Sequence, residues 1–516
     1  MEKNTLLAVI LSLFVLVGWS FLTNDNTAPQ NAGQFEGAQV QKEDSAAAVQ
    51  KQVSATQTSQ PAPLMESADN GKDIIVETDL YKAVFSTRGA TIKYWELKKF
   101  NPDDTPVVLL DEPGTIPALG IILEGIDRNL PQKLTYKASA DKLVLSENGR
   151  REGVLIFEYN NSGTMIRKKF VFHNDQFKVD LSIDTANTPP YMLAIGTNFC
   201  EGDNGQREHS GPVLLANDDR EAFDADMDET ENFTGYINWI AKENKYFTAA
   251  LIPVTPVEGA TVWKETDSAE IAFKLAPQKN EFIFYAGPKE YDRLKSFDAG
   301  LEHLIDFGWF SIVAMPLFWI LKFFYSFLGN YGWSIVLLTI VTRIPFIPLM
   351  HKSQQSMKKM SKIQPMMAEI KEKYKNDAQR QQKEMMALYK KHKVNPIGGC
   401  LPMVLQIPVF IALYNVLLNA IELRGAPFIF WITDRAVKDP YYVLPIVMGA
   451  TMVLQQKMTP TAMDPKQAKM MMFMPVVFTF MFLSFASGLV VYWLINNILG
   501  IAQQHYANTR PEKSEA

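Results

Sequence analysis

Hydrophobic and polar positions divide this chain into two unlike parts. Between residues 73 and about 287, short segments in which apolar and polar residues alternate are separated by turn residues. A period of two residues predicts strands with one buried face. Asn161–Gly163 and Asn174–Asp175 lie where hairpin turns are expected. We therefore expect an antiparallel β-sandwich domain over residues 73–290.

The part after residue 300 contains long apolar runs with short connections, which predict helices that cross a bilayer. A further run, 6–22, is longer than the usual signal-sequence core and lacks a small-x-small cleavage site, which favours a retained anchor at 1–22 over a cleaved signal peptide. The other five spans are expected at about 331–350, 401–418, 441–456, 470–485 and 489–501.

Charge assigns the sides of these spans. Residues 351–395 carry twelve Lys or Arg against four acids, and such loops stay cytoplasmic. With one anchor before it, the β domain is then outside, so only one span separates the two. The stretch 301–328 is accordingly interpreted as an amphipathic helix on the outer interface. The basic segment itself predicts a helical hairpin that turns at Asn376–Asp377.

Two polar segments complete the division. Residues 23–72 are rich in Gln, Ala, Ser, Thr and Asn, and predict a disordered periplasmic linker. A short cytoplasmic tail is expected at 506–516, after the membrane domain at 331–505. The acidic segment 201–231 is read as a solvated loop, since a calcium-binding loop needs Gly where Glu229 stands.

Composition adds exclusions. The two cysteines, Cys200 and Cys400, fall in different halves and predict no disulfide framework, while the six histidines lack ligand spacing. The chain has neither a Gly-x-Ser-x-Gly nor a nucleotide-binding Gly-x-x-x-x-Gly-Lys-Ser/Thr motif. We therefore expect no enzyme activity, no cofactor and no metal.

One charge stands inside the second span. Arg343 lies nine residues from Ser334 and eight from His351, so at about 1.5 Å per residue it sits roughly 12 Å from either end of the span. No Asp or Glu occurs in any expected span. The charge must therefore be hydrated or held by neutral acceptors, which implies a water-filled cavity facing the bundle interior. The alternatives are an arginine that only holds helices together through carbonyls, or a soluble core helix whose arginine reaches a surface.

Neighbouring polar residues have helical spacing with this site. Thr339 lies four residues before Arg343, and Asn496 lies four residues after Tyr492, so each pair shares a helix face. Four motifs extend the pattern: Asn395-Pro-Ile-Gly-Gly-Cys-Leu-Pro402, Gln455-Gln-Lys-Met-Thr-Pro460, Phe473-Met-Pro475 and Ser487-Gly-Leu-Val-Val-Tyr-Trp493.

With the arginine-bearing span and the basic hairpin, these motifs resemble the YidC family of bacterial membrane protein insertases, over essentially the whole chain. The resemblance implies a periplasmic β-supersandwich and an α-helical polytopic membrane domain of six transmembrane helices. Five of those helices would form a core around a hydrophilic groove open to the cytoplasm and to lipid. Expected groove residues are Arg343, Thr339, Gln406, Gln456, Tyr492, Trp493 and Asn496, and expected apolar contacts to a client are Ile407 and Phe410.

The function that the resemblance implies is insertion of inner-membrane proteins. Arg343 would take the short acidic tail of a nascent protein part-way into the membrane, and the following apolar segment would partition into lipid at about 25 cal/mol per Å². Implied partners are nascent membrane proteins and the Sec translocon. The hairpin 351–395 would receive anionic lipids, the ribosome, or the signal recognition particle or its receptor. Both termini would be cytoplasmic, at the bacterial inner membrane.

Two other classes of protein remain open from the residues alone. A solute or anion transporter or channel would use Arg343 as its binding charge, although no inverted repeat is visible. A membrane enzyme with a carbohydrate-processing sandwich would need paired acids in a cleft of the β domain. Ion flux in liposomes would distinguish the transporter, and the location of the acids would distinguish the enzyme.

Overall fold

The computed structural model describes residues 71–509, except 101–104, 201–208, 267, 396–400, 427, 430, 433, 435–436 and 460–464. The expected anchor 1–22, nearly all of the linker 23–72 and the tail from 510 onward lie outside the described residues. The described part is β-rich up to residue 288 and helical from residue 291 onward, and this division confirms the coarse prediction of a β part followed by a helical part.

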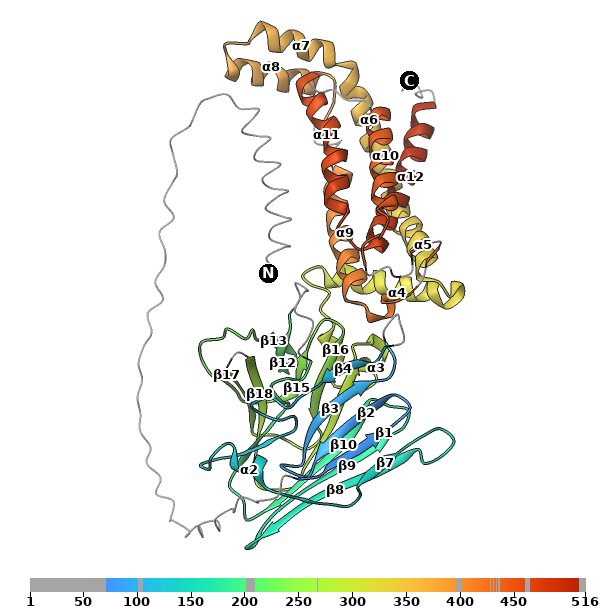
Figure 1. The fold of residues 1–516 in the computed structure, drawn as a ribbon. Coiled ribbons are helices and arrows are strands. Elements are labelled where there is room, and N and C mark those ends of the chain that lie inside the picture. Colours follow the sequence, from blue (N-terminus) through green and yellow to red (C-terminus); the bar gives the residue numbers. More distant parts are fainter. Residues whose placement is uncertain are drawn as a thin grey trace, which may run out of the picture. The chain divides into compact units, whose positions relative to one another are not determined.

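Three sheets build the β part (Figure 1). The largest has nine strands in the order β13 (Asp219–Ala222), β12 (Gly211–Ala216), β15 (Ile237–Glu243), β16 (Phe247–Pro253), β19 (Asn280–Pro288), β10 (Lys178–Ala186), β9 (Thr164–His173), β8 (Glu152–Asn161) and β6 (Lys137–Ala138). A five-stranded sheet has the order β4 (Val107–Leu110), β3 (Thr91–Leu97), β2 (Tyr81–Ser86), β1 (Asp73–Glu77) and β7 (Lys142–Val144). The other five-stranded sheet is β14 (Glu231–Phe233), β17 (Gly259–Glu265), β18 (Ser268–Leu275), β11 (Tyr191–Ala194) and β5 (Ile121–Leu123).

Strand register shows that both smaller sheets cover one face of the large sheet. Leu181 of β10 pairs with Phe170 of β9 and with Phe282 of β19, so these side chains share a face. Phe85 of β2 contacts Phe170 at a ring distance of 5.0 Å, and Phe273 of β18 contacts Phe282 at 5.8 Å. The β part is therefore a two-layer sandwich, and among the strands that the structure describes every pair is antiparallel except β1 with β7.

Short helices cover part of the opposite face of the large sheet. Gly300 precedes the 3-10 helix η1 (Leu301–Leu304) and has a left-handed backbone conformation, with φ of 72°. A Cβ added to that glycine would lie 2.9 Å from Leu215 of β12. Lys289 reaches the carbonyl of Leu304 at 3.4 Å and the carboxylate of Glu243 at 3.2 Å. This explains why β15 and β16 are buried on both faces and lack the alternation seen in β8, β9 and β10.

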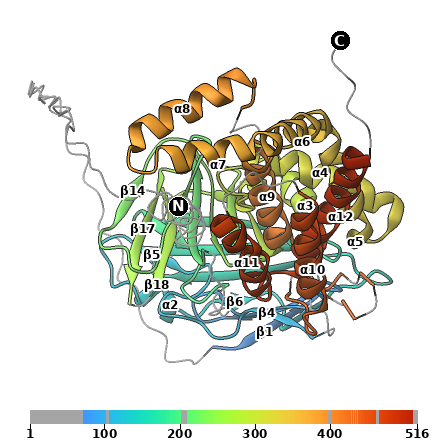
Figure 2. The same cartoon turned by 90° about the horizontal axis from the view of Figure 1, so that it is seen from above.

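The helical part follows. Its helices are α3 (Tyr291–Lys295), α4 (Ser311–Leu328), α5 (Tyr331–Arg343), η2 (Ile344–Phe346), α6 (Ile347–Lys362), α7 (Gln364–Lys373), α8 (Ala378–Lys391), α9 (Leu401–Asn419), η4 (Ile421–Leu423), α10 (Val443–Met458), α11 (Pro465–Phe482) and α12 (Ser487–Thr509), with one four-residue helix, α2 (Leu130–Lys133), in the β part. Helix α12 packs against α5, α9 and α10, while α4 packs across α5 and α9 (Figure 1). The antiparallel helices α7 and α8 lie side by side in both views (Figure 1, Figure 2).

Membrane-compatible length is found in two helical segments of the described residues. Ser311–Leu328 and Tyr331–Lys362 are long and apolar enough to cross a membrane, and Val404–Asn419 and Met471–Phe482 are shorter apolar helices. The Asn330 side chain accepts hydrogen bonds from the backbone N–H groups of Gly332 and Trp333, which fixes the start of α5.

Three expected boundaries differ from the structure. The helix that begins at Tyr331 does not end near Met350 but continues to Lys362. It contains a 3-10 turn at Ile344–Phe346, because Pro345 and Pro348 lack the N–H groups for regular helical hydrogen bonds there. The stretch 301–328 is two elements, η1 and α4, with α4 beginning only at Ser311. The acidic segment 201–231 is not one loop, because 211–216 and 219–222 form β12 and β13.

Candidate functional site

Arg343 ends α5 and points across to α12. Its Nη1 donates to the backbone carbonyl of Asn496 at 2.5 Å and also to the Asn496 side-chain oxygen. Among the described residues, these are the only hydrogen-bond acceptors of this guanidinium. Neither acceptor is charged, so Arg343 is held by neutral groups at one nitrogen, while Nη2 and Nε retain donors for another partner.

A cavity of about 20 Å³ lies beside this arginine. It is lined by Thr339, Thr342, Arg343, Phe346, Met350, Gln406, Val409, Tyr492 and Asn496. This volume suits about one water molecule. The cavity is therefore narrow; six of its nine lining residues have polar side chains, and none of the nine is acidic.

Five of the seven expected groove residues line this cavity. Gln406 and Tyr492 are joined by a side-chain hydrogen bond. The Thr339 hydroxyl instead donates to the backbone carbonyl of Ile335 at 2.7 Å, within its own helix. The expected groove residues inside the cavity are Thr339, Arg343, Gln406, Tyr492 and Asn496.

Gln456 is not among the lining residues, and its neighbour Gln455 is the glutamine close to the arginine. A Cβ added to Gly500 would lie 2.7 Å from Gln455 Nε2 and 3.1 Å from Arg343 Nη2. Adjacent residues on a helix point about 100° apart, so only one of two neighbouring glutamines can face α12 there. The structure therefore brings Gln455, and not the expected Gln456, close to the arginine.

Trp493 lies in an aromatic cluster and is not among the cavity-lining residues. Its ring is perpendicular to that of Phe410, with centroids 5.0 Å apart, and lies 5.2 Å from Phe482 and 6.3 Å from Phe478. The cluster joins α9, α11 and α12. Phe410 is therefore partly covered, whereas Ile407, three residues earlier, is 46% exposed.

The expected groove residues did not include the lining residues Thr342, Phe346, Met350 and Val409, or the neighbouring Gln455 and Gly500. Of these, Gly500 is the one that the sequence could have predicted most readily, because it continues the helix face on which Tyr492 and Asn496 recur every four residues.

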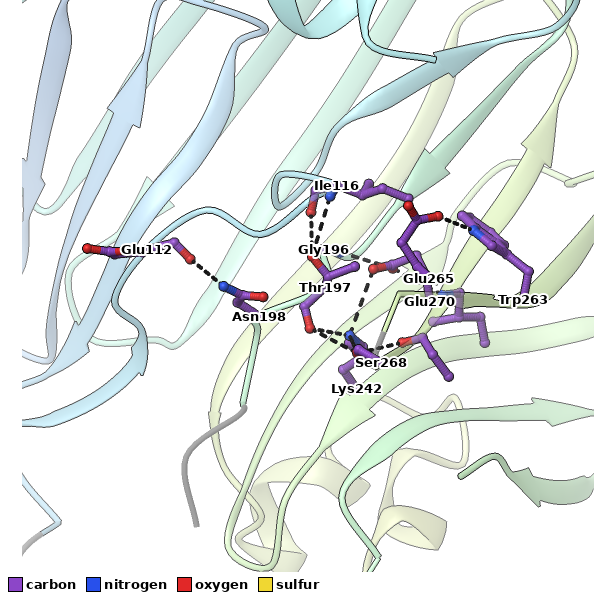
Figure 3. A network of polar contacts seen from close by, with 12 residues as sticks. Glu112, Ile116, Gly196, Thr197, Asn198, Lys242, Trp263, Glu265, Ser268 and Glu270 are labelled. Carbon is purple, nitrogen blue, oxygen red and sulfur yellow. Dashed lines mark hydrogen bonds and ion pairs between the residues drawn. The ribbon is translucent and has the colours of Figure 1, made fainter. Parts of the chain in front are cut away.

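A second polar network lies inside the sandwich (Figure 3). Lys242 of β15 donates to the Thr197 carbonyl at 2.5 Å and lies 3.8 Å from Glu270 of β18. Glu270 Oε1 accepts from the backbone N–H groups of Gly196 and Ile271 at 3.1 and 3.0 Å. Burial raises the pKa of the Glu270 carboxyl, and the Lys242 ammonium opposes this shift.

The carboxylates of this network are engaged in structural contacts. Glu265 accepts from the Trp263 indole N–H at 2.9 Å and from Arg128 at 3.2 Å, while Glu270 is fully buried. Together with Lys242, these contacts link the large sheet to a five-stranded sheet. The arrangement fits a support of the fold better than the paired acids that a carbohydrate-processing enzyme requires.

These features describe a chain with a large β part, two helical segments long and apolar enough to cross a membrane, and an arginine that donates to uncharged oxygens beside a narrow cavity. Residues 323–514 match the family described as 60Kd inner membrane protein, and residues 73–320 match the YidC periplasmic domain. The protein named membrane protein insertase YidC of Geotalea uraniireducens is 42% identical over 98% of this chain and 99% of its own length. Its counterpart in Syntrophus aciditrophicus is 39% identical over 98% and 99%.

The chain therefore belongs to the YidC family of membrane protein insertases. A solved structure, titled as an active YidC insertase crystal structure with the first transmembrane domain resolved, is 19% identical and covers 86% of this chain and 95% of its own, with a TM-score of 0.40. The resemblance stated from the motifs is confirmed, and the relatives are named as membrane protein insertases.

Proposed function

We propose that this chain inserts single-span and polytopic clients into the bacterial inner membrane, with Arg343 as the charge that receives their acidic tails. The observation that carries the proposal is the hydrogen bonding of Arg343, which is held by uncharged oxygens and lines a cavity without an acid. A guanidinium cannot lose its proton in a protein, so the positive charge is permanent. A carboxylate from a client is the partner that this site lacks.

The cavity residues have two proposed roles, which are to orient Arg343 and to supply neutral polar atoms. Asn496 fixes Arg343 through Nη1, so the remaining donors can meet a carboxylate in a bidentate manner. Gln406 and Tyr492 supply neutral polar atoms from α9 and α12. A cavity of about 20 Å³ admits a tail only if the helices separate. Insertion then begins when a client displaces about one water molecule and spreads the helices.

The apolar client segment would leave along the exposed side of α9 and α11. Ile407 is 46% exposed, and Val477 and Phe480 are 59% and 70% exposed. Transfer of such a segment into lipid is favourable by about 25 cal/mol per Å² of apolar area. This term supplies the driving force, so no nucleotide hydrolysis is required.

The remaining architecture belongs to the same proposal. It has six spans, of which five form the insertase core at 331–505, and both termini are cytoplasmic. The β domain at 73–290 is a periplasmic supersandwich. Helices α7 and α8 form the cytoplasmic hairpin within 351–395, whose excess of Lys and Arg favours anionic lipids or the ribosome. The Sec translocon and the signal recognition particle or its receptor are further proposed partners.

Helix α4 is proposed to lie in the plane of the outer interface. The helix packs on α5 and α9, and its buried residues are Ala314, Leu317, Phe318 and Leu321. It also presents large apolar side chains to the surroundings, which suits a helix half-immersed in lipid. These exposed residues are Ile312, Trp319, Phe323 and Phe327, together with Trp309 just before the helix.

The test is insertion by the purified protein in liposomes. Client pairs share one apolar span and differ only in whether the tail is acidic or carries Asn and Gln instead. We expect Arg343→Ala to lower insertion of the acidic client by roughly 10-fold or more, because the variant loses a hydrogen bond between charged groups. We expect Arg343→Lys to reduce insertion less, since lysine keeps the positive charge and loses only the planar set of guanidinium donors.

An unchanged yield for the acidic client in Arg343→Ala, at equal protein content, would contradict the proposal. Ion flux through the same liposomes tests the transporter alternative. Flux that depends on Arg343 without client would favour an anion pathway instead.

A further inference from the structure

Gly500 lies on α12 one turn beyond Asn496, directly against the arginine. The three nearest atoms to a Cβ built on this glycine would be side-chain ends: Gln455 Nε2 at 2.7 Å, Arg343 Nη2 at 3.1 Å and Gln455 Cδ at 3.3 Å. Gly500 itself is buried. The glycine thus leaves a notch in α12, and the guanidinium and the Gln455 amide fill it.

Helix geometry explains why a glycine is needed at this position. In an α-helix the carbonyl of residue i accepts from the N–H of residue i+4, so the Asn496 carbonyl points toward Gly500. A side chain at i+4 lies over that carbonyl and hinders a second donor. Arg343 Nη1 nevertheless reaches this oxygen at 2.5 Å, as a second donor to a carbonyl inside a helix.

We propose that Gly500 is a positioning residue for Arg343: it uncovers the Asn496 carbonyl and thereby docks the guanidinium on α12, beside the cavity that Arg343 lines. The dock comprises Asn496, Gly500 and Gln455. This inference rests on the proposed function, because the docked charge matters only if clients use it.

The dock counters the tendency of an arginine in apolar surroundings to extend toward the nearest water. Without an accessible carbonyl, the flexible side chain leaves the cavity and takes its charge with it. With the dock, a client carboxylate meets donors that are already oriented, and so loses less entropy on binding. Gly500 acts on charge selectivity and not on the apolar step.

Substitution at this glycine should spare the fold, because the atoms that an added Cβ meets are the ends of two long side chains and can move. We expect Gly500→Ala to lower the ratio of acidic-client to neutral-client insertion about threefold, because the variant weakens one charge-assisted hydrogen bond without removing it. Gly500→Val, which shields the carbonyl on both sides, should lower that ratio roughly 10-fold, close to Arg343→Ala. Insertion of the neutral client should change less than about twofold, since its apolar step does not use the charge.

Gly449→Ala is the matched control. It is also a helical glycine-to-alanine change, and its Cβ would meet Thr479 Oγ1 of α11 at 2.0 Å, away from the dock. A packing defect of this kind should affect both clients alike and leave the ratio unchanged. The decisive measurement repeats Gly500→Ala and Gly500→Val in the Arg343→Ala background, where neither should lower the ratio further.

Each result discriminates. A ratio unchanged by Gly500→Val, while Arg343→Ala lowers it, overturns the dock and leaves the proposed function standing. A further fall of the ratio in the Arg343→Ala background also overturns the dock, because Gly500 would then act independently of the arginine. A ratio that Arg343→Ala itself does not change overturns both proposals.

Discussion

Asn496→Asp tests whether the neutrality of the acceptors at Arg343 is functional. The substitution preserves size and keeps an oxygen where the Asn496 side chain already accepts from Nη1. It converts a neutral acceptor into a counter-ion. The prediction is that a permanent internal carboxylate occupies the guanidinium and competes with the carboxylate of a client.

The magnitude follows from the contact. Two unit charges about 4 Å apart attract by about 4 kcal/mol at an effective dielectric constant of 20, and desolvation of the new carboxylate cancels part of this. A hydrogen bond to a charged group is worth about 1.5–3 kcal/mol, against about 0.5–1.5 kcal/mol between neutral groups. The net gain of the docked state is then about 1–2 kcal/mol, which corresponds to a factor of roughly 5–30 in equilibrium.

The assay is the same comparison of acidic and neutral clients in liposomes. Insertion of the acidic client should fall by roughly 5–30-fold, while the neutral client changes by less than about twofold. Asn497→Asp is the matched control, since the Asn497 side chain donates to Thr451 at 3.1 Å on the side of α10 and not to the arginine. Wild-type insertion of the acidic client by Asn496→Asp, or an equal loss with Asn497→Asp, would refute the reasoning.

Two further predictions concern other parts of the molecule. Glu243→Gln should lower the free energy of unfolding of the full chain in detergent by about 3 kcal/mol, because it leaves the buried Lys289 without its counter-ion; urea unfolding followed by tryptophan fluorescence measures this. Glu281→Gln, at an exposed pair, should cost less than about 1 kcal/mol, and equal losses would contradict the argument. Trp493→Phe should leave the acidic-to-neutral ratio unchanged, since Trp493 packs in the aromatic cluster; a fall like that of Arg343→Ala would place it functionally in the cavity.

Much of the fold could be predicted where burial is one-sided. Strands β8, β9 and β10 alternate between buried and more exposed residues, so period two is visible in the sequence. Strand β12 lies within an acidic segment, and five of its six residues are buried, so neither its composition nor its periodicity marked it. The sequence pattern reports contact with solvent, and a strand covered on both faces has no such signal.

The helical part shows the same limit for helix ends. Charge density after Met350 marks where the chain becomes polar, but helix formation depends on backbone hydrogen bonds, and these continue to Lys362. Hydropathy thus located the apolar runs and missed the length of the helix. A break was expected where only the environment of the helix changes.

Candidate site residues could be predicted from the sequence where two polar residues recur at helical spacing. Tyr492 and Asn496 are four residues apart and both line the cavity. Gln455 and Gln456 are adjacent in a helix that is apolar on most sides, so no periodicity decides which one faces α12. Tyr492 and Trp493 raise the same ambiguity, and the structure separates them between the cavity and the aromatic cluster.

The nature of the acceptors at Arg343 connects stability with function. Insertion scales assign a central arginine a cost of about 3 kcal/mol, and each hydrogen bond from its guanidinium returns about 1.5–3 kcal/mol. The two oxygens of Asn496 are therefore sufficient to keep the charge within the helices. An acid at this position would hold the arginine more firmly, but it would also satisfy the charge that a client carboxylate needs. Neutral oxygens retain the arginine without neutralising its charge, which is why a carboxamide and an uncovered carbonyl suit the proposed site, whose partner would arrive from outside.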